Sequence, residues 1–138
     1  MTVLLDANVL IALVVVDHAH HERVRSWFDV DRQQFSTCPV TQGALLRHLL
    51  RGGAATTESL DVLNGLSNST RHEFWPDDLG YDVVDLRGVV GHRQVTDAYL
   101  AALARSRGGR LATLDRALAL LHPDVALLVE PPTPAQRA

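Results

Sequence analysis

Two short apolar runs, each followed by an aspartate, constrain the fold of this chain most strongly. Thr2–Leu5 is β-prone and has no alternation of polar and apolar residues, and Leu111–Leu114 is a second apolar run. Strands of this kind are buried on both faces, as in a parallel sheet. Asp6 directly follows the first run and Asp115 the second. The two runs therefore predict a parallel sheet with acidic residues at the carboxyl ends of two strands.

Helical patterns separate the expected strands. The expected helices are one beginning at Asn8, one beginning at His20, Thr41–Arg51, Glu58–Leu66, Val95–Ser106 and a short one that ends at Leu121. The further expected strands are Phe35–Pro39, Glu73–Trp75, Tyr81–Leu86 and Val125–Val129. Strands that alternate with helices predict a three-layer α/β/α sandwich around a short, mainly parallel sheet.

Length and composition indicate one domain. The 138 residues are 46% apolar, which is enough for one hydrophobic core. We expect a single domain over residues 1–130 and a loose tail over residues 131–138, which hold three prolines. The single cysteine, Cys38, cannot form an internal disulfide, and no secretory pattern occurs, so a cytoplasmic location is expected. The longest apolar run, Val9–Val16, is too short to cross a membrane, so no membrane association is expected.

The net charge of −3 excludes a protein that binds nucleic acid through bulk positive charge. Any contact with nucleic acid must then be local. All thirteen basic residues other than histidine are arginines, whose planar guanidinium suits phosphate groups. His92 and Arg93 lie shortly before Asp97, Arg116 follows Asp115, and Arg47 lies in the expected helix Thr41–Arg51. These residues could contact phosphates, although each one alone fits better as an ordinary surface residue without a ligand.

Three aspartates are the candidate site residues. In open parallel sheets the working crevice lies outside the carboxyl ends of the strands. Asp6 and Asp115 occupy such positions, and Asp97 stands at the start of the apolar helix Val95–Ser106. We expect the three to face one crevice, with Asp97 kept ionised by the helix N-terminus. Carboxylates brought together repel one another and, without a cation, take up protons at unusually high pH.

A divalent metal ion would remove this repulsion. Mg²⁺ prefers oxygen ligands and keeps several waters, and Mn²⁺ accepts the same ligands. A metal held by Asp6, Asp97 and Asp115 predicts phosphodiester hydrolysis. Each aspartate alone also fits a turn or a helix cap, so the residues by themselves leave both interpretations open.

Three blocks of sequence resemble the signatures of PIN-domain proteins. They are LLDANVL (Leu4–Leu10), VTDAYLAALA (Val95–Ala104) and LATLDRAL (Leu111–Leu118). The segment STCPVTQGALLR (Ser36–Arg47) is also similar to the VapC branch, the toxins of bacterial VapBC toxin–antitoxin pairs. The resemblance covers nearly the whole chain.

The resemblance implies a sandwich around a short parallel sheet and an Mg²⁺- or Mn²⁺-dependent endoribonuclease with an RNA substrate. It also implies a homodimer and a small antitoxin protein that docks against the site. By position, Asp6, Asp97 and Asp115 match the metal-binding acids of the family. Asn8 and Thr113 match polar neighbours that orient the site.

One position departs from the family pattern. Gln42 stands where the family usually has a glutamate. The glutamine keeps a carbonyl oxygen but lacks the negative charge of the acid. We expect weaker metal binding, and this motivates an alternative: a nuclease-impaired PIN domain that binds RNA or antitoxin without efficient cleavage. A phosphatase with Asp6 as nucleophile is disfavoured, because Asn8 rather than an acid lies two residues later.

Overall fold

Five parallel strands form the centre of the molecule in the computed structural model, which describes residues 1–130 apart from the side chain of Asp31. The strands are β1 (Val3–Leu5), β2 (Phe35–Thr37), β3 (His72–Phe74), β4 (Arg110–Thr113) and β5 (Ala126–Leu128). Their order is β3-β2-β1-β4-β5, and each pairs with its neighbour in parallel. The tail expected over residues 131–138 lies outside the described residues.

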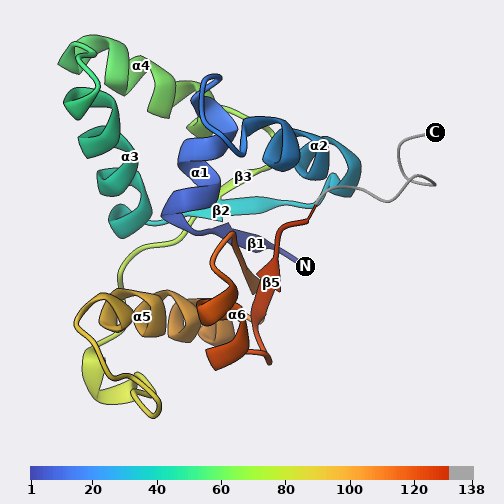
Figure 1. Cartoon of the computed structure of the whole chain (residues 1–138), viewed down its shortest axis with the longest axis vertical. Coiled ribbons are helices and arrows are strands. Elements are labelled where there is room, and N and C mark those ends of the chain that lie inside the picture. The colour runs from blue at the N-terminus through green and yellow to red at the C-terminus, as the bar shows by residue number, and fades with distance from the viewer. Residues whose placement is uncertain (131–138) are drawn as a thin grey trace.

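Helices cover both faces of the sheet. They are α1 (Ala7–Val14), α2 (His21–Asp31), α3 (Pro39–Arg51), α4 (Thr56–Ser67), α5 (Arg93–Ser106) and α6 (Arg116–Leu121). Figure 1 shows α1 to α4 on one side of the sheet and α5 and α6 on the other. The predicted α/β/α sandwich is therefore confirmed, and the sheet is parallel throughout its described strands. No helix within residues 1–130 is both long enough and apolar enough to span a membrane.

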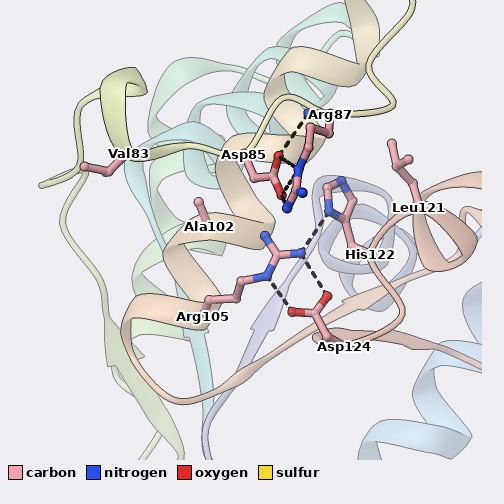
Figure 2. A pocket seen from close by; sticks show the side chains of 8 residues that line it. All are labelled: Val83, Asp85, Arg87, Ala102, Arg105, Leu121, His122 and Asp124. Carbon is pink, nitrogen blue, oxygen red and sulfur yellow. Dashed lines mark hydrogen bonds and ion pairs between the residues drawn. The ribbon is translucent and has the colours of Figure 1, made fainter.

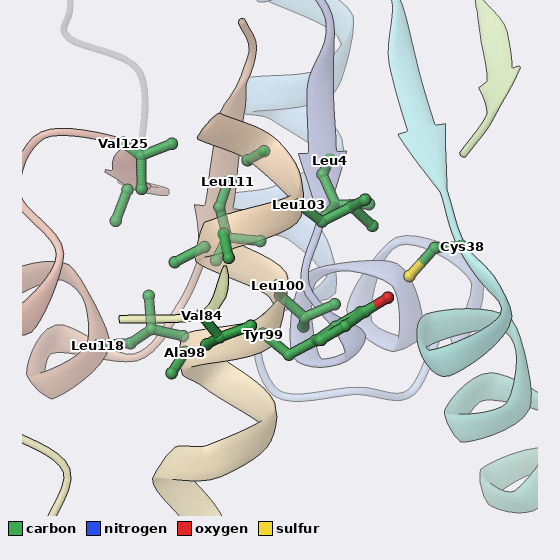
Figure 3. Close-up of a cluster of buried hydrophobic side chains, with 14 of the residues drawn as sticks. Leu4, Cys38, Val84, Ala98, Tyr99, Leu100, Leu103, Leu111, Leu118 and Val125 are labelled. Carbon is green, nitrogen blue, oxygen red and sulfur yellow. The ribbon is translucent and has the colours of Figure 1, made fainter. Parts of the chain in front are cut away.

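Two hydrophobic clusters hold the layers together. Val3 and Leu5 of β1 belong to the cluster under α1, while Leu4 between them belongs to the cluster under α5, as the alternation of a strand requires. Figure 3 shows the second cluster, in which Leu100 and Leu103 of α5 lie with Leu4 and Leu111. All residues of α5 from 98 to 104 are buried, which confirms the expected burial of this helix.

The strand predicted over Tyr81–Leu86 is wrong. Tyr81–Val83 forms a short 3₁₀-helix, η1, and the chain then turns. The Asp85 carboxylate accepts hydrogen bonds from the backbone N–H and the guanidinium of Arg87, and this local pairing favours a turn over a sheet ladder. Only Val84 of the predicted strand is buried.

The other boundaries shift by a few residues. Helix α3 begins at Pro39 rather than at Thr41, because proline lacks the N–H that a first helical turn leaves unpaired. Strand β2 consequently ends at Thr37 instead of Pro39. Helix α5 begins at Arg93, two residues before the expected start.

Gly109 offers a test of how tightly α5 is joined to β4. A Cβ atom at this position would collide with the carbonyl oxygen of Thr2 and lie 2.9 Å from the ring of Trp75. We expect Gly109→Ala to lower the free energy of unfolding by about 1–3 kcal/mol, because the backbone must move to admit the methyl group. Chemical denaturation measures this change.

Gly65 in α4 is the matched control, because a Cβ there meets nothing within 4 Å. Gly65→Ala should stabilise the protein by about 0.5–1 kcal/mol through helix propensity. Equal effects of the two substitutions would contradict the close approach at Gly109.

Candidate metal centre

Asp6 is the buried acid of the site. It follows β1 and is 7% exposed. Its Oδ1 accepts a hydrogen bond from the backbone N–H of Ala7 at 2.8 Å, and its Oδ2 accepts one from the Thr113 hydroxyl at 2.7 Å. These two bonds supply part of the solvation that a buried carboxylate has lost. Burial nevertheless raises the pKa of Asp6, and the charge of Asp115 adds to the rise.

Thr113 links the first strand to the fourth. Its hydroxyl donates to Asp6, and its oxygen accepts the backbone N–H of Asp115 at 3.0 Å. The Asp115 Oδ1 in turn accepts the N–H groups of Ala117 and Leu118, so it caps α6. A short chain of bonds thus joins Asp6, Thr113 and Asp115 at the carboxyl edge of the sheet.

Asn8 makes a second link between the segments that follow β1 and β4. Its Oδ1 accepts the backbone N–H of Leu114 at 3.1 Å, although the two residues are far apart in sequence. The side chain therefore fixes the start of α1 against the loop between β4 and α6. The resemblance implies an orienting role for Asn8 and Thr113, and both side chains form hydrogen bonds at this edge of the sheet.

Asp97 differs electrostatically from the sequence expectation. Because α5 begins at Arg93, Asp97 lies in its second turn, where the helix N-terminus no longer gives much stabilisation. The pKa of Asp97 is raised from its ordinary value of 3.8 to about 6. Burial is the largest cause, and the negative charges of Asp6 and Asp115 contribute the rest. The expectation of ready ionisation is wrong. The expected mutual repulsion of the three carboxylates is present instead.

The donors near Asp97 fit a hard divalent cation. Asp6, Asp97 and Asp115 offer only oxygen atoms, and no hydrogen bond within the described chain occupies the Asp97 carboxylate. No group of three His, Cys, Asp or Glu side chains within residues 1–130 is close enough to form a ligand set by itself. Mg²⁺ does not need one, because it keeps several waters and is commonly held by one or two carboxylates.

Gln42 belongs to a different network. Its Nε2 donates to the Thr37 hydroxyl oxygen at 3.0 Å, and the same oxygen lies 2.8 Å from Nε2 of His72. Since Thr37 accepts from Gln42, its own proton is free to bond a neutral His72 ring. Burial lowers the pKa of His72, which favours that neutral form. None of the hydrogen bonds of Gln42 in the described structure reaches the three aspartates.

Sequence reasoning did not identify Thr37 and His72. Thr37 is fully buried at the end of β2, and His72 begins β3. Their contact depends on how β2 pairs with β3, and no motif in either segment indicates that pairing.

A cavity with a different lining is shown in Figure 2. It is about 360 Å³ in volume and is lined by Val83, Asp85, Arg87, Ala102, Arg105, Leu121, His122 and Asp124. Arg105 donates to both Asp124 oxygens, at 2.6 and 2.9 Å, and lies 3.1 Å from Nδ1 of His122. These contacts join the end of α5 to the loop before β5. The cavity contains none of the predicted site residues, and we assign its polar groups to structure.

Comparison with known proteins gives the family. The PIN-domain model matches residues 3–121. The chain belongs to the PIN-domain family. It is 57% identical over 129 residues to Ribonuclease VapC29 of Mycobacterium tuberculosis, covering 94% of this chain and 97% of that protein. The predicted family is thus confirmed.

Solved structures of PIN-domain toxins share the fold. The crystal structure of Mycobacterium tuberculosis VapC20, described as a toxin that cleaves the sarcin–ricin loop, superposes with a TM-score of 0.67 at 14% identity. That match covers 86% of this chain and 94% of VapC20. VapBC2 from Rickettsia felis, bound to a DNA fragment from its promoter, gives a TM-score of 0.65 at 12% identity over 92% of this chain and 97% of that one.

The raised pKa of Asp97 predicts that this residue destabilises the metal-free PIN domain. A carboxyl whose pKa is higher in the folded state than in the unfolded state costs stability as pH rises from about 4 to above 6. We expect Asp97→Asn to raise the free energy of unfolding at pH 7.5 by about 1–2 kcal/mol, after allowance for solvent screening. At pH 3.5 the substitution should have little effect. Denaturant titration without divalent metal measures both values.

Asp61→Asn on α4 is the control, because Asp61 is an exposed acid outside the site. It should leave stability unchanged at both pH values. A loss of stability in Asp97→Asn at pH 7.5 would show that the Asp97 charge is not repelled by its neighbours.

Proposed function

We propose that this PIN-domain protein is a metal-dependent endoribonuclease that acts as the toxin of a toxin–antitoxin pair. The observation that carries the proposal is the hydrogen-bonded unit of Asp6, Thr113 and Asp115, whose charges act on Asp97. The name of the 57% identical relative, Ribonuclease VapC29, supports it. VapC20 adds support as an RNA-cleaving toxin with the same fold. The reaction is hydrolysis of RNA phosphodiester bonds.

Asp6, Asp97 and Asp115 would hold the metal, with Mg²⁺ as the proposed ion and Mn²⁺ as a second that suits the same oxygens. A bound divalent ion supplies positive charge that offsets the carboxylates and stabilises charge on the phosphate under attack. Thr113 keeps the Asp6 carboxylate turned toward β4, and Asn8 joins the start of α1 to the loop after β4. These two residues position the acids.

The RNA backbone needs local positive charge, because the whole chain is acidic. His92 and Arg93 stand exposed at the start of α5, and Arg116 stands exposed at the start of α6. Asp97 lies one turn further along α5, and Asp115 caps α6. We assign these exposed groups to phosphates on either side of the scissile bond.

The proposed protein partners are a small antitoxin and a second copy of the chain. The Rickettsia felis neighbour is described as a VapBC complex, which supports an antitoxin partner for a toxin of this fold. The homodimer rests on the resemblance to the VapC branch.

A nuclease-impaired PIN domain is the second candidate function. It is favoured by one observation: the side chain at position 42 is neutral, and its amide donates a hydrogen bond to Thr37. Such a protein would bind RNA or antitoxin without efficient cleavage.

Metal-dependent cleavage of RNA distinguishes the two functions. We expect the purified chain to cut total cellular RNA into discrete fragments with Mg²⁺ or Mn²⁺, and chelation to stop the reaction. Asp97→Asn should reduce the rate by at least about 100-fold, because one metal-binding carboxylate is lost. Asp61→Asn should cut normally. Intact RNA at every metal concentration would favour the nuclease-impaired alternative.

The contribution of position 42 has a separate test. Gln42→Glu removes the amide that donates to Thr37 and restores the acid usual for the family. We expect the concentration of Mg²⁺ that gives half-maximal cleavage to fall several-fold, since the added charge favours a cation. Unchanged metal dependence would contradict the role proposed for this position.

A further inference from the structure

A small cavity is lined by residues of α3, of α5 and of the segment that follows β3, and the proposed reaction does not use it. It is about 240 Å³ in volume and is lined by Val40, Asp77, Leu79, Tyr81 and Tyr99. Val40 lies on α3 two residues before Gln42, and Tyr99 lies on α5 two residues after Asp97. The cavity therefore lies between the first turn of α3 and the second turn of α5, on the helices that also carry Gln42 and Asp97.

The walls of this cavity suit a flat ring. The side chain of Tyr81 is 49% exposed, and its ring centroid lies 5.3 Å from that of Tyr99 at an interplanar angle of 42°. Tyr99 itself is buried in the core, with its hydroxyl directed toward Cys38 (Figure 3). Tyr99 thus supports Tyr81 from behind, and the apolar side chains of Val40 and Leu79 complete the walls.

The size of the cavity limits what it can hold. Pockets for drug-sized ligands and cofactors measure roughly 300–1,000 Å³. A cavity of about 240 Å³ is smaller and fits a single base rather than a whole cofactor. Unpaired RNA bases commonly stack on exposed aromatic side chains.

Asp77 is the polar group of the cavity. No arginine within residues 1–130 forms an ion pair with it, whereas the adjacent Asp78 pairs with Arg107 at 2.8 Å. A hydrogen bond from the Cys38 thiol lowers the pKa of Asp77, although burial raises it more strongly. Asp77 is exposed, so its carboxylate remains available to accept hydrogen bonds from a ligand.

An acceptor with two oxygens selects among the four bases. Guanine presents two adjacent donors, the ring N1–H and the 2-amino group, on its Watson–Crick edge. Adenine and cytosine each present one amino group on that edge, next to acceptors that a carboxylate repels. Uracil presents one N–H between two carbonyl oxygens. Guanine alone matches both carboxylate oxygens.

We propose that this cavity receives an unpaired guanine of the RNA substrate, which stacks on Tyr81 and donates its N1–H and 2-amino hydrogens to Asp77. The proposal rests on the proposed ribonuclease function and adds the residues that choose where the RNA is cut. Val40 and Tyr99 belong to the same helices as Gln42 and Asp97, so an RNA strand whose guanine is held there can extend toward the carboxyl edge of the sheet where the acids lie.

Binding can be measured without cleavage, because the chain has only two tyrosines and both line the cavity. Protein labelled with 3-fluorotyrosine gives one fluorine NMR signal from each, and Tyr81→Phe assigns them. We expect guanosine monophosphate to shift both signals saturably. Inosine monophosphate, which lacks the 2-amino group, and adenosine monophosphate should bind at least about fivefold more weakly.

Matched substitutions separate the two contacts. Asp77→Asn should weaken the binding of guanosine monophosphate by about tenfold, so that it binds no more tightly than adenosine monophosphate. Asp78→Asn, on the adjacent acid that pairs with Arg107, should change neither value. Tyr81→Ala should weaken the binding of all the nucleotides. The Tyr81→Phe protein should bind them normally, because phenylalanine keeps the aromatic face for stacking.

Mapping of cleavage sites completes the test. Asp77→Asn should still cut RNA but should lose the preference for guanine beside the cut. If the wild-type chain binds guanosine monophosphate at the tyrosines but cuts no RNA, the ribonuclease proposal fails and the guanine site stands. If it cuts RNA while the signals ignore all nucleotides and the Asp77→Asn map is unchanged, the guanine site is overturned. Signals that shift only on dilution of the protein would overturn it too, because the cavity would then face a second copy.

Discussion

The hydrogen bond from the Thr113 hydroxyl to the Asp6 carboxylate is the contact on which the site depends. It joins residues 107 positions apart and is fully buried. A buried carboxylate is costly unless it accepts strong hydrogen bonds, and Asp6 receives one from Thr113 and one from the start of α1. The parallel pairing of β1 with β4 places these groups side by side, so the sheet topology makes the buried acid tolerable.

The same arrangement places the acids where their negative charges repel one another. Burial and the neighbouring charges raise the pKa of Asp97 to about 6, and the pKa of Asp6 is raised in spite of its hydrogen bonds. A fold selected for stability alone would place neutral groups here. The retained repulsion is consistent with a cation site, in which the free energy lost in the metal-free protein is regained when the ion binds.

Prediction from the sequence succeeded where one signal was local and strong. The apolar runs that end at Asp6 and Asp115 identified two strands and the edge where both acids lie. The ionisation of Asp97 was misjudged, because it depends on where α5 begins and on charges from other elements. The segment Tyr81–Leu86 was misjudged because a local pairing of Asp85 with Arg87 favours a turn. The network of Gln42 depends on strand register, which no local pattern encodes.

The strand order also divides the carboxyl edge into two halves. Asp6 and Asp115 follow the central neighbours β1 and β4, whereas Val40 and Asp77 follow β2 and β3 on the other half. The acids on one half are linked through Thr113 by a buried and a part-buried hydrogen bond, so a substitution there disturbs both strands. The segment from Asp77 to Tyr81 is mostly exposed and outside the sheet ladder, so its residues are free to vary. If the proposed sites are right, a fold organised in this way can change the base it selects while the proposed metal-binding groups stay fixed.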